Sequence, residues 1–293
     1  MDVGNKNFYK LRGFTLIEIS VVLVIIGLII GGALLGRDLI ISASTRAQIS
    51  QIEEYNTAIN TFRLKYGYLP GDIPEPAATS VGLETRGTSA GEGDGNNIME
   101  GVNTAGTNCA TCNAAGETVM LWEDLSTAGL IEGGFTVASP TTPVASPLIL
   151  TEITNPPIKR YFPRAKFDDT SYVYVWSQSG VNHFCVAEIF ALYNVSSYVH
   201  SSPTMTVQMA YAIDSKIDDG LPRSGRIVAR LIFQNQILGA AGEGHNGATT
   251  NGATPALSYT CYDNNNVANA TQRYTMATNG GAGINCSLTF RFQ

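Results

Sequence analysis

Two clusters of oxygen-bearing side chains are the clearest candidates for binding chemistry in this sequence. The first lies in the glycine-rich segment 91–100, where Asp94 and Asn96 stand between Glu92 and Glu100. Carboxylate and amide oxygens are the ligands that Ca²⁺ takes in proteins. The spacing departs from the EF-hand loop, which has Gly at its sixth position and Glu at its twelfth. The segment is therefore either a calcium site or a solvated acidic loop.

The second cluster consists of Asp214, Asp218 and Asp219. Its carboxylates suit a calcium site, and they equally suit the end of a helix followed by an Asp-Gly turn. Both interpretations stay open from the sequence. Calcium is the one cofactor for which these residues provide candidate ligands, and no other cofactor is predicted.

Enzymatic chemistry finds little support. The three histidines lack the spacing of metal ligands, and the chain contains neither a Gly-x-Ser-x-Gly elbow nor a phosphate-binding loop. Cys185 lies two residues from His183, an arrangement that packing on one strand face explains as well as a catalytic pair does. We therefore predict that the protein is not an enzyme.

Composition excludes some classes of partner. The 293 residues carry a formal net charge of −6, and only 14% of them are charged. An acidic chain has no general basic field of the kind that supplies non-specific affinity for nucleic acid. No nucleic-acid partner is therefore predicted. Hydrophobic residues make up 44% of the chain, which is too many for a disordered protein.

The longest apolar block runs from Phe14 to Leu35 and is interrupted by a single carboxylate, that of Glu18. A helix of this length spans roughly 33 Å, close to the ~30 Å hydrocarbon core of a bilayer. Basic residues precede the block, so the positive-inside rule predicts a cytoplasmic N-terminus and an exported body. A signal peptide cleaved at residues 42–44 is the alternative, but its apolar region would be only about 7–15 residues long.

A specific resemblance lies in the run Arg12-Gly13-Phe14-Thr15-Leu16-Ile17-Glu18. It resembles the prepilin leader and mature start of type IV pilins and type II secretion pseudopilins. The resemblance implies that prepilin peptidase cuts between Gly13 and Phe14 on the cytoplasmic side and methylates the new amino terminus. It also implies that the Glu18 carboxylate pairs with the Phe14 amino group of a neighbouring subunit. The implied partners are this peptidase, other pilin or pseudopilin subunits and an inner-membrane assembly platform.

The apolar block must be followed by a second helical half. Apolar residues recur every three or four positions along one stripe, with Gln48 and Gln51 assigned to other faces: Ile49, Ile52, Tyr55, Ile59, Phe62 and Tyr66. With no proline before Pro70, one helix over residues 14–66 is predicted. The expected organisation is a leader at 1–13, a membrane or filament-core helix at 14–36, an amphipathic half at 37–67 and an exported domain at 68–293.

The exported body is expected to be mixed. Residues 71–116 are interpreted as a long surface loop, followed by a helix over 117–130 and a proline-rich connector at 139–157. Strands are predicted at 172–176, 183–190, 226–233 and 287–292, and a short helix through residue 216 is expected to be capped by Ser202. The fold class is therefore α+β, with a pilin-like long N-terminal helix and an antiparallel sheet.

Export makes disulfides permissible for the five cysteines. Many pilins have a disulfide-bounded C-terminal region, and this resemblance favours a Cys261–Cys286 pair. Such a bond closes a loop of about 26 residues and contributes about 3–4 kcal/mol. Cys109 and Cys112 form a C-x-x-C in a loop, where a local disulfide is favoured over a redox centre. Cys185 is expected to be a buried thiol.

Together these features predict a pilin-like structural subunit. It would reside in the bacterial inner membrane as a single-pass protein, with its C-terminal domain in the periplasm, and then enter a filament. At 293 residues it is large for a major pilin, so a minor pilin is favoured. The alternatives are a type II secretion pseudopilin and an adhesive or ligand-binding module displayed on a pilin-like stalk, with loops 71–116 and 239–257 as its binding surface.

Overall fold

The fold is that of a computed structural model. It describes residues 13–102, 108–109, 112–136, 138, 158–193, 198–229, 260–263, 271–277 and 279–292. Most of the leader, the connector at 139–157, the loop at 239–257 and the second half of the strand predicted at 226–233 lie outside these residues. The chain divides into two compact units, Met1–Ala43 and Ser44–Gln293.

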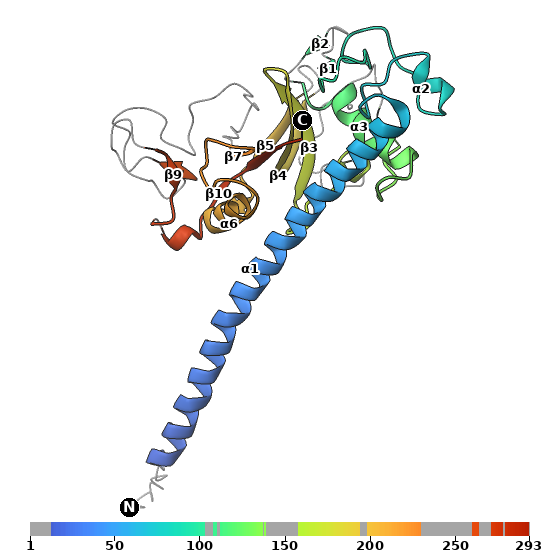
Figure 1. The fold of residues 1–293 in the computed structure, drawn as a ribbon. Coiled ribbons are helices and arrows are strands. Elements are labelled where there is room, and N and C mark those ends of the chain that lie inside the picture. The colour runs from blue at the N-terminus through green and yellow to red at the C-terminus, as the bar shows by residue number, and fades with distance from the viewer. Residues whose placement is uncertain are drawn as a thin grey trace, which may run out of the picture. The chain divides into compact units, whose positions relative to one another are not determined.

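Helix α1, Leu16–Tyr66, passes through both units without interruption (Figure 1). It corresponds to the single long helix predicted from the sequence, beginning two residues later. Its C-terminal end is set by Gly67, which adopts a φ of 82° and donates its N–H to the Arg63 carbonyl at 2.8 Å. Glycine is the usual residue at this position because it has no Cβ to oppose the left-handed conformation.

An antiparallel sheet forms the centre of the second unit. Its strands are β3 (Ser171–Gln178), β4 (Val181–Tyr193), β11 (Leu288–Arg291) and β7 (Ile227–Ala229), hydrogen-bonded in that order, while β5 (Tyr198–Ser202) also pairs with β4. β11 therefore inserts between β4 and β7, although it follows both in the chain. A tight turn at Ser179 and Gly180, both with positive φ, joins β3 to β4. This conformation matches the twist of antiparallel strands.

The core of the second unit joins α1 to the sheet through aromatic rings. Tyr55 of α1 meets Trp122 edge to face at a centroid distance of 5.0 Å, and Trp122 lies 6.1 Å from Phe184 of β4. Trp122 belongs to α3, Glu117–Thr127, which corresponds to the helix predicted at 117–130. Such pairs add to the stabilisation that area burial alone provides. The long helix, the short helix and the sheet are therefore one packed core in this unit.

The remaining elements are short. α2 and α5 lie before and after the α3 region, β1 pairs with β2, β6 with β10, and β8 with β9. Their bounds, with those of α6 and η1, are Ala77–Ser80 (α2), Gly101–Val102 (β1), Asn108–Cys109 (β2), Ile158–Tyr161 (α5), Met205–Thr206 (β6), Val207–Ile217 (α6), Tyr262–Asp263 (β8), Arg273–Tyr274 (β9), Asn279–Gly281 (η1) and Ile284–Cys286 (β10).

The interpretation of residues 71–116 as a surface loop is wrong for much of the segment. Arg86 is buried, and its guanidinium contacts both carboxylate oxygens of Asp124 on α3 at 2.6 Å. The same carboxylate accepts the Gly71 N–H at 2.6 Å. A Cβ on Gly71 would lie 2.4 Å from the Glu117 carbonyl oxygen, so only glycine permits this approach. The segment can be polar and still be buried in part, because Arg86 pairs with a carboxylate on α3.

The predicted helix cap at Ser202 is also wrong. Ser202 is the last residue of β5, and α6 begins at Val207. Its N-cap is Thr206, whose hydroxyl accepts the Met209 N–H at 3.1 Å. Threonine is a good cap because its side chain replaces a backbone partner that the first turn lacks.

Candidate functional site

The N-terminal end of α1 is closed by a pair of side chains. Glu18 Oε2 accepts the Thr15 N–H at 2.7 Å and the Thr15 hydroxyl at 2.8 Å. In return, the Thr15 hydroxyl oxygen accepts the Glu18 N–H at 3.3 Å. This reciprocal arrangement is a capping box, and its signature is Thr followed three residues later by Glu before an apolar run. The spacing of Thr15 and Glu18 carries that signature in the sequence, in addition to the charge for which Glu18 was singled out.

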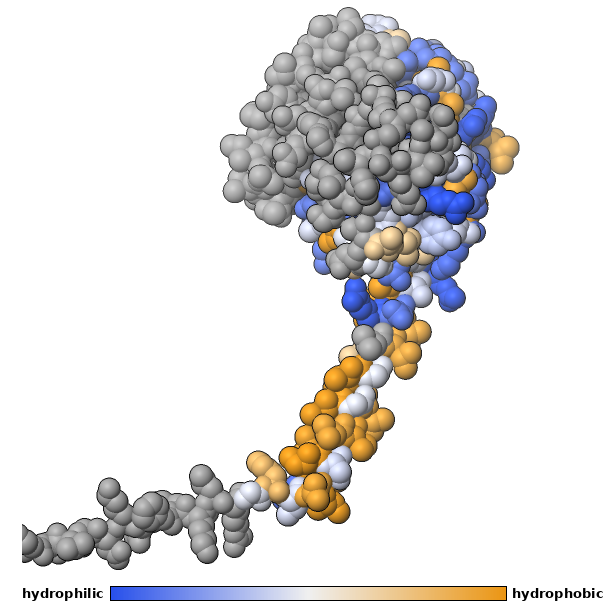
Figure 2. Space-filling model, turned by 90° about the vertical axis from the view of Figure 1, so that its left-hand side faces the viewer, coloured by the Kyte–Doolittle hydropathy of each residue, from blue (hydrophilic) through white to orange (hydrophobic). Residues whose placement is uncertain are grey.

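The apolar half of α1 is exposed along its length. Side chains such as Leu16, Leu28 and Leu35 are 92%, 72% and 70% exposed. Figure 2 shows hydrophobic side chains gathered along this part of the helix. The surfaces of soluble monomers rarely present so large a continuous apolar area. This half of the helix is long and apolar enough to cross a membrane, by length and composition.

Four glycines lie on the same half of the helix. A Cβ added at Gly27, Gly31, Gly32 or Gly36 would meet nothing within 4 Å in this chain. Small residues spaced four apart let a second helix approach closely, because they remove the side chains that keep backbones apart. The glycines therefore provide room for a neighbour and have no packing role within the described part of this chain.

Comparison with known families identifies a motif at the N-terminal end of the chain. Residues 10–34 match the family model of the prokaryotic N-terminal methylation motif. The chain carries a prepilin-type methylation motif. This motif is the hallmark of type IV pilins and pseudopilins. Neither the curated proteins nor the solved structures gave a match to the chain.

The methylation motif has direct consequences for the N-terminal half. It implies processing by prepilin peptidase and assembly with other pilin subunits. Together with the apolar helix it fits a protein anchored in the inner membrane. It points to a structural subunit rather than an enzyme. The motif covers residues 10–34 only, so it identifies no role for the second unit.

The second unit contains the expected disulfide between Cys261 and Cys286. It joins the residue before β8 to the last residue of β10. Cys112 is also disulfide-bonded, but the side chain of Cys109 lies outside the described residues, so their pairing stays a prediction. Cys185 is a buried thiol on β4.

The carboxylates that the structure brings together around Asp94 differ from those that the sequence indicated, since Asp72 and Glu117 take the place of Glu92 and Glu100. One oxygen each of Asp72, Asp94 and Glu117 lies within 4.8 Å of the others. Asp72 and Glu117 are 1% and 0% exposed, whereas Asp94 is exposed. Asn96 serves the local turn, since its Oδ1 accepts the Ile98 N–H at 2.6 Å. Asp72 and Glu117 were missed because they lie far from Asp94 in the sequence.

Backbone N–H groups surround the two buried carboxylates. Asp72 accepts from Gly95 and Asn97, both at 2.7 Å. Glu117 accepts from Gly93 at 3.0 Å and from Glu100 at 2.9 Å. These bonds hold the segment 93–100 against the start of α3. The two acids therefore have a structural role whether or not a cation binds beside them.

Burial dominates the protonation of this cluster. It raises the pKa of Asp72 to about 7, with a further increase from the charge of Asp94. The backbone N–H groups of Asn97 and Gly95 oppose that increase. Burial also raises the pKa of Glu117 well above its ordinary value, and the charge of Asp72 adds to the effect. The folded protein therefore holds protons here at pH values where free carboxylates are ionised.

The second cluster closes a turn. Asp214 accepts from the Tyr274 hydroxyl at 2.7 Å, and Asp218 accepts from the backbone N–H groups of Arg226 and Ile227. Asp219 caps the turn by accepting the Leu221 N–H at 2.8 Å. Oxygens of the three acids still lie within 4.8 Å of one another. The helix-end alternative thus has direct structural support, and calcium at this cluster stays a prediction.

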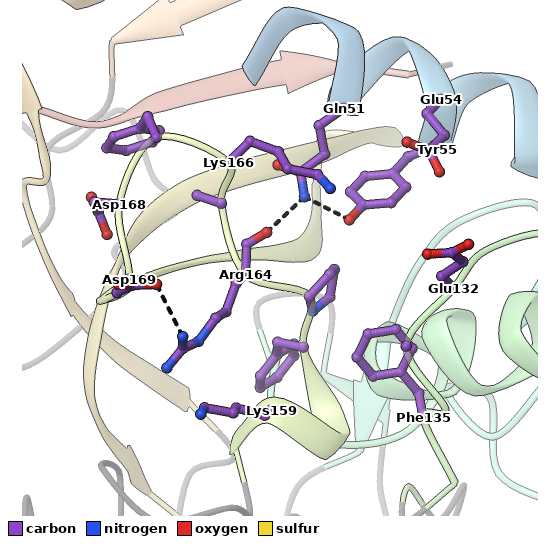
Figure 3. Close-up of a pocket in the computed structure, with 15 residues that line it drawn as sticks. Gln51, Glu54, Tyr55, Glu132, Phe135, Lys159, Arg164, Lys166, Asp168 and Asp169 are labelled. Carbon is purple, nitrogen blue, oxygen red and sulfur yellow. Dashed lines mark hydrogen bonds and ion pairs between the residues drawn. The ribbon is translucent and has the colours of Figure 1, made fainter. Parts of the chain in front are cut away.

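Two glutamines of α1, Gln48 and Gln51, lie on its buried face and not on other faces as predicted. Gln48 Oε1 accepts the Lys166 N–H at 3.0 Å, and Gln51 Nε2 donates to the Arg164 carbonyl at 2.6 Å (Figure 3). Their spacing of three places both on one side of the helix. Gln48 and Gln51 therefore bind the backbone of segment 164–166 to α1.

The raised pKa of Asp72 predicts an unusual pH dependence of stability. A carboxyl whose pKa is higher in the folded state than its ordinary value of about 4 binds more protons when folded. Its contribution to the free energy of unfolding falls as the pH rises from about 4 to 7, by an amount on the order of 2–4 kcal/mol. Denaturant unfolding of the detergent-solubilised chain at pH 5 and pH 8 measures this. Asp72→Asn should remove the part of the difference that Asp72 contributes and leave the part that Glu117 contributes, whereas the exposed Glu84→Gln in the same segment should keep the whole difference. Equal pH dependence in both variants would contradict the assignment.

Calcium binding to the first cluster stays a prediction with its own test. A divalent cation would replace the proton as the neutralising charge, so its effect should grow as the carboxylates ionise. We expect CaCl₂ to raise the melting temperature by several degrees at pH 8 and by much less at pH 5. Asp94→Asn should reduce this shift, while Glu84→Gln, which changes an exposed carboxylate outside both clusters, should leave it intact. Absence of both calorimetric binding and a melting shift at pH 8 would remove the calcium prediction.

Proposed function

We propose that this chain is a minor pilin-like subunit of a type IV pilus-type filament. It is inserted in the inner membrane through residues 14–36, with its N-terminus in the cytoplasm and residues 68–293 in the periplasm. Prepilin peptidase then cleaves between Gly13 and Phe14 and methylates Phe14. The processed subunit enters the filament through the apolar half of α1, with an inner-membrane assembly platform as its further partner.

One observation carries this proposal: the helix that bears the methylation motif exposes its entire apolar half. Burying apolar surface contributes about 25 cal/mol per Å², so such a helix is stable only in lipid or among other apolar helices. A subunit that leaves the membrane for a filament exchanges one such environment for the other. Cleavage before Phe14 leaves this helix attached to the domain, unlike cleavage of a signal peptide.

The capping box gives the assembly role of Glu18 a structural basis. The carboxylate is held at the first turn of α1, next to Phe14, and its hydrogen bonds to Thr15 use Oε2 alone. Oε1 therefore remains available to the amino group of a neighbouring Phe14. An ion pair between this carboxylate and the amino group neutralises two charges that are poorly solvated in an apolar surrounding. We infer that this pairing fixes the register between adjacent subunits.

Two alternatives share the same N-terminal chemistry. A type II secretion pseudopilin differs in the machine that assembles it, and the dependence of assembly on the pilus or the secretion machinery separates the two. A ligand-binding module displayed on a pilin-like stalk differs in what the second unit does. The features of α1 discussed above support all three. The size of the chain favours a minor over a major pilin, and the dependence of assembly on one machine or the other decides between pilus and pseudopilus.

The proposal predicts the processed N-terminus. Intact mass and N-terminal sequencing of membrane-extracted protein should show a chain that begins at Phe14 and carries one additional methyl group. Cells without prepilin peptidase should retain residues 1–13. Gly13→Leu should block cleavage because it alters the residue at the scissile bond, whereas Gly4→Leu in the same leader should not. A chain beginning near residue 45, or a leader retained regardless of the peptidase, would exclude the pilin pathway.

The role of Glu18 can be separated from its capping role. Glu18→Gln keeps the capping box, since glutamine also serves at this position, but removes the charge. Thr15→Ala does the reverse, weakening the helix start by about 0.5–2 kcal/mol while keeping the carboxylate. We expect the Glu18→Gln subunit to be processed normally. Its incorporation into filaments should fall at least about ten-fold, which is equivalent to 1.4 kcal/mol. Thr15→Ala should still assemble. Immunoblots of sheared filaments and membranes measure both, and normal assembly of Glu18→Gln would refute the pairing.

A further inference from the structure

Two arginines and a histidine form one row across the central sheet. His183 of β4 pairs directly with Arg291 of β11. On the other side of β11, the Arg291 N–H donates to the Arg226 carbonyl at 2.8 Å, and the adjoining pair of the ladder is Phe290 with Ile227. Arg226, which precedes β7, therefore lies opposite Arg291. Directly opposed residues point to the same face of a sheet, so the three side chains stand beside one another on one face.

A pocket of about 260 Å³ opens over this row. Besides the three residues of the row, the sheet strands contribute Gln178, Val181 and Val228 to its lining. Gln178 pairs with Val181, which lies two positions before His183, and Val228 lies two positions after Arg226. Side chains alternate between the faces of a strand, so all six positions project to the same face. The register of the sheet therefore places the side chains themselves in the walls of the pocket.

The two arginines of the row are open to solvent. Arg226 and Arg291 are both exposed, as is Ser179 in the turn beside them, which also lines the pocket. His183 is only 8% exposed, and its ring stacks on that of Trp176 at a centroid distance of 5.2 Å. His183 therefore belongs to the floor of the pocket. The groups that a ligand reaches are the two guanidinium groups and the polar side chains of the turn.

No carboxylate stands among the described residues that line this pocket. Other arginines of the second unit are neutralised by an acid: Arg86 pairs with Asp124 at 2.6 Å, and Arg164 pairs with Asp169 at 3.1 Å (Figure 3). Arg226 forms no ion pair in the part of the chain that the structure describes. In a chain of net charge −6, a pocket lined by arginines without an acid is a local exception. Its field attracts anions.

The Asp218 carboxylate serves the backbone beside this pocket. Its Oδ2 accepts the N–H groups of both Arg226 and Ile227. Both bonds use main-chain donors, so the guanidinium group of Arg226 takes no part in them. Two like charges that face each other across neighbouring strands destabilise a sheet. An anion bound between Arg226 and Arg291 removes this repulsion, and its binding is favoured for that reason.

We propose that this pocket binds a small phosphate monoester through its phosphoryl group. At neutral pH a monoester carries about two negative charges on three terminal oxygens, so it balances the charges of Arg226 and Arg291. A guanidinium group presents parallel N–H donors that match such oxygens. A carboxylate or a phosphate diester carries a single charge and leaves one arginine without compensation. The charge of the pocket therefore selects the monoester.

The dimensions of the pocket limit the organic part of the ligand. Its volume of about 260 Å³ lies just below the range of about 300–1,000 Å³ that is usual for pockets with drug-sized ligands. Val181 and Val228 are half-buried and offer apolar contacts to a short ester substituent. The site goes beyond the filament role and does not rest on it, because every residue that lines it belongs to the second unit.

Calorimetry of the full chain tests the proposal. The protein is solubilised in dodecyl maltoside, whose headgroup is uncharged, and titrated at constant ionic strength with methyl phosphate and with dimethyl phosphate. We expect methyl phosphate to bind one to one. Its affinity should exceed that of dimethyl phosphate at least about five-fold, because the diester has one charge and two terminal oxygens. At about ten times its Kd, methyl phosphate should raise the melting temperature by a few degrees.

Matched substitutions locate the site on the sheet. Arg226→Gln and Arg291→Gln each remove one guanidinium group and keep the backbone hydrogen bonds of the strand. Either change should weaken methyl phosphate at least about five-fold. Arg273→Gln removes an exposed arginine of β9 outside the pocket and should leave the affinity unchanged. Without ligand, Arg226→Gln should melt no lower than the wild-type protein, because a like-charge contact is removed.

Three results would overturn the proposal. The first is an absence of methyl phosphate binding, or equal affinity for methyl and dimethyl phosphate. The second is wild-type affinity in both Arg226→Gln and Arg291→Gln. The third is tighter binding of an oligothymidylate than of methyl phosphate, which would make this face a nucleic-acid surface.

Discussion

The side chains in the apolar half of α1 have to be covered by something other than their own helix. This requirement is the constraint on which the other properties of the protein depend. The side chains of this half have no partner surface among the described residues of their own unit, so lipid or neighbouring helices must cover them. In the second half of the same helix the apolar side chains are covered by the chain itself: Ile52, Ile59 and Phe62 are almost fully buried. One continuous helix thus serves two environments. The change from uniform to one-sided hydrophobicity along its length is what makes this possible.

The parts that the sequence predicted well are those governed by local patterns. The long helix, the helix around Trp122 and the strand that contains Val173 and Val175 follow from periodicity and from the absence or presence of Gly and Pro. These features needed no knowledge of which distant residues meet.

The parts that were missed depend on distant pairings. Arg86 and Asp124 satisfy one another across 38 positions, so a polar segment is buried where composition indicated a surface loop. Gln51 reaches the Arg164 carbonyl, and its amide therefore belongs to the buried face of α1. The carboxylate cluster likewise joins Asp72 and Glu117 to Asp94. A polar side chain can be buried when a hydrogen-bonding partner lies beside it in the fold. The sequence alone does not show which distant residue that partner is.

The position of β11 has a consequence for the order in which the sheet can form. This strand forms hydrogen bonds with β4 on one side and β7 on the other, although both precede it in the chain. Until residues 288–291 are in place, β7 pairs with no other described strand of the central sheet, and β4 has only β3 beside its residues 183–186. The sheet therefore cannot close progressively from its first strand to its last. The body must stay open to the insertion of a late strand, and this open interval is the stage of folding most exposed to proteolysis.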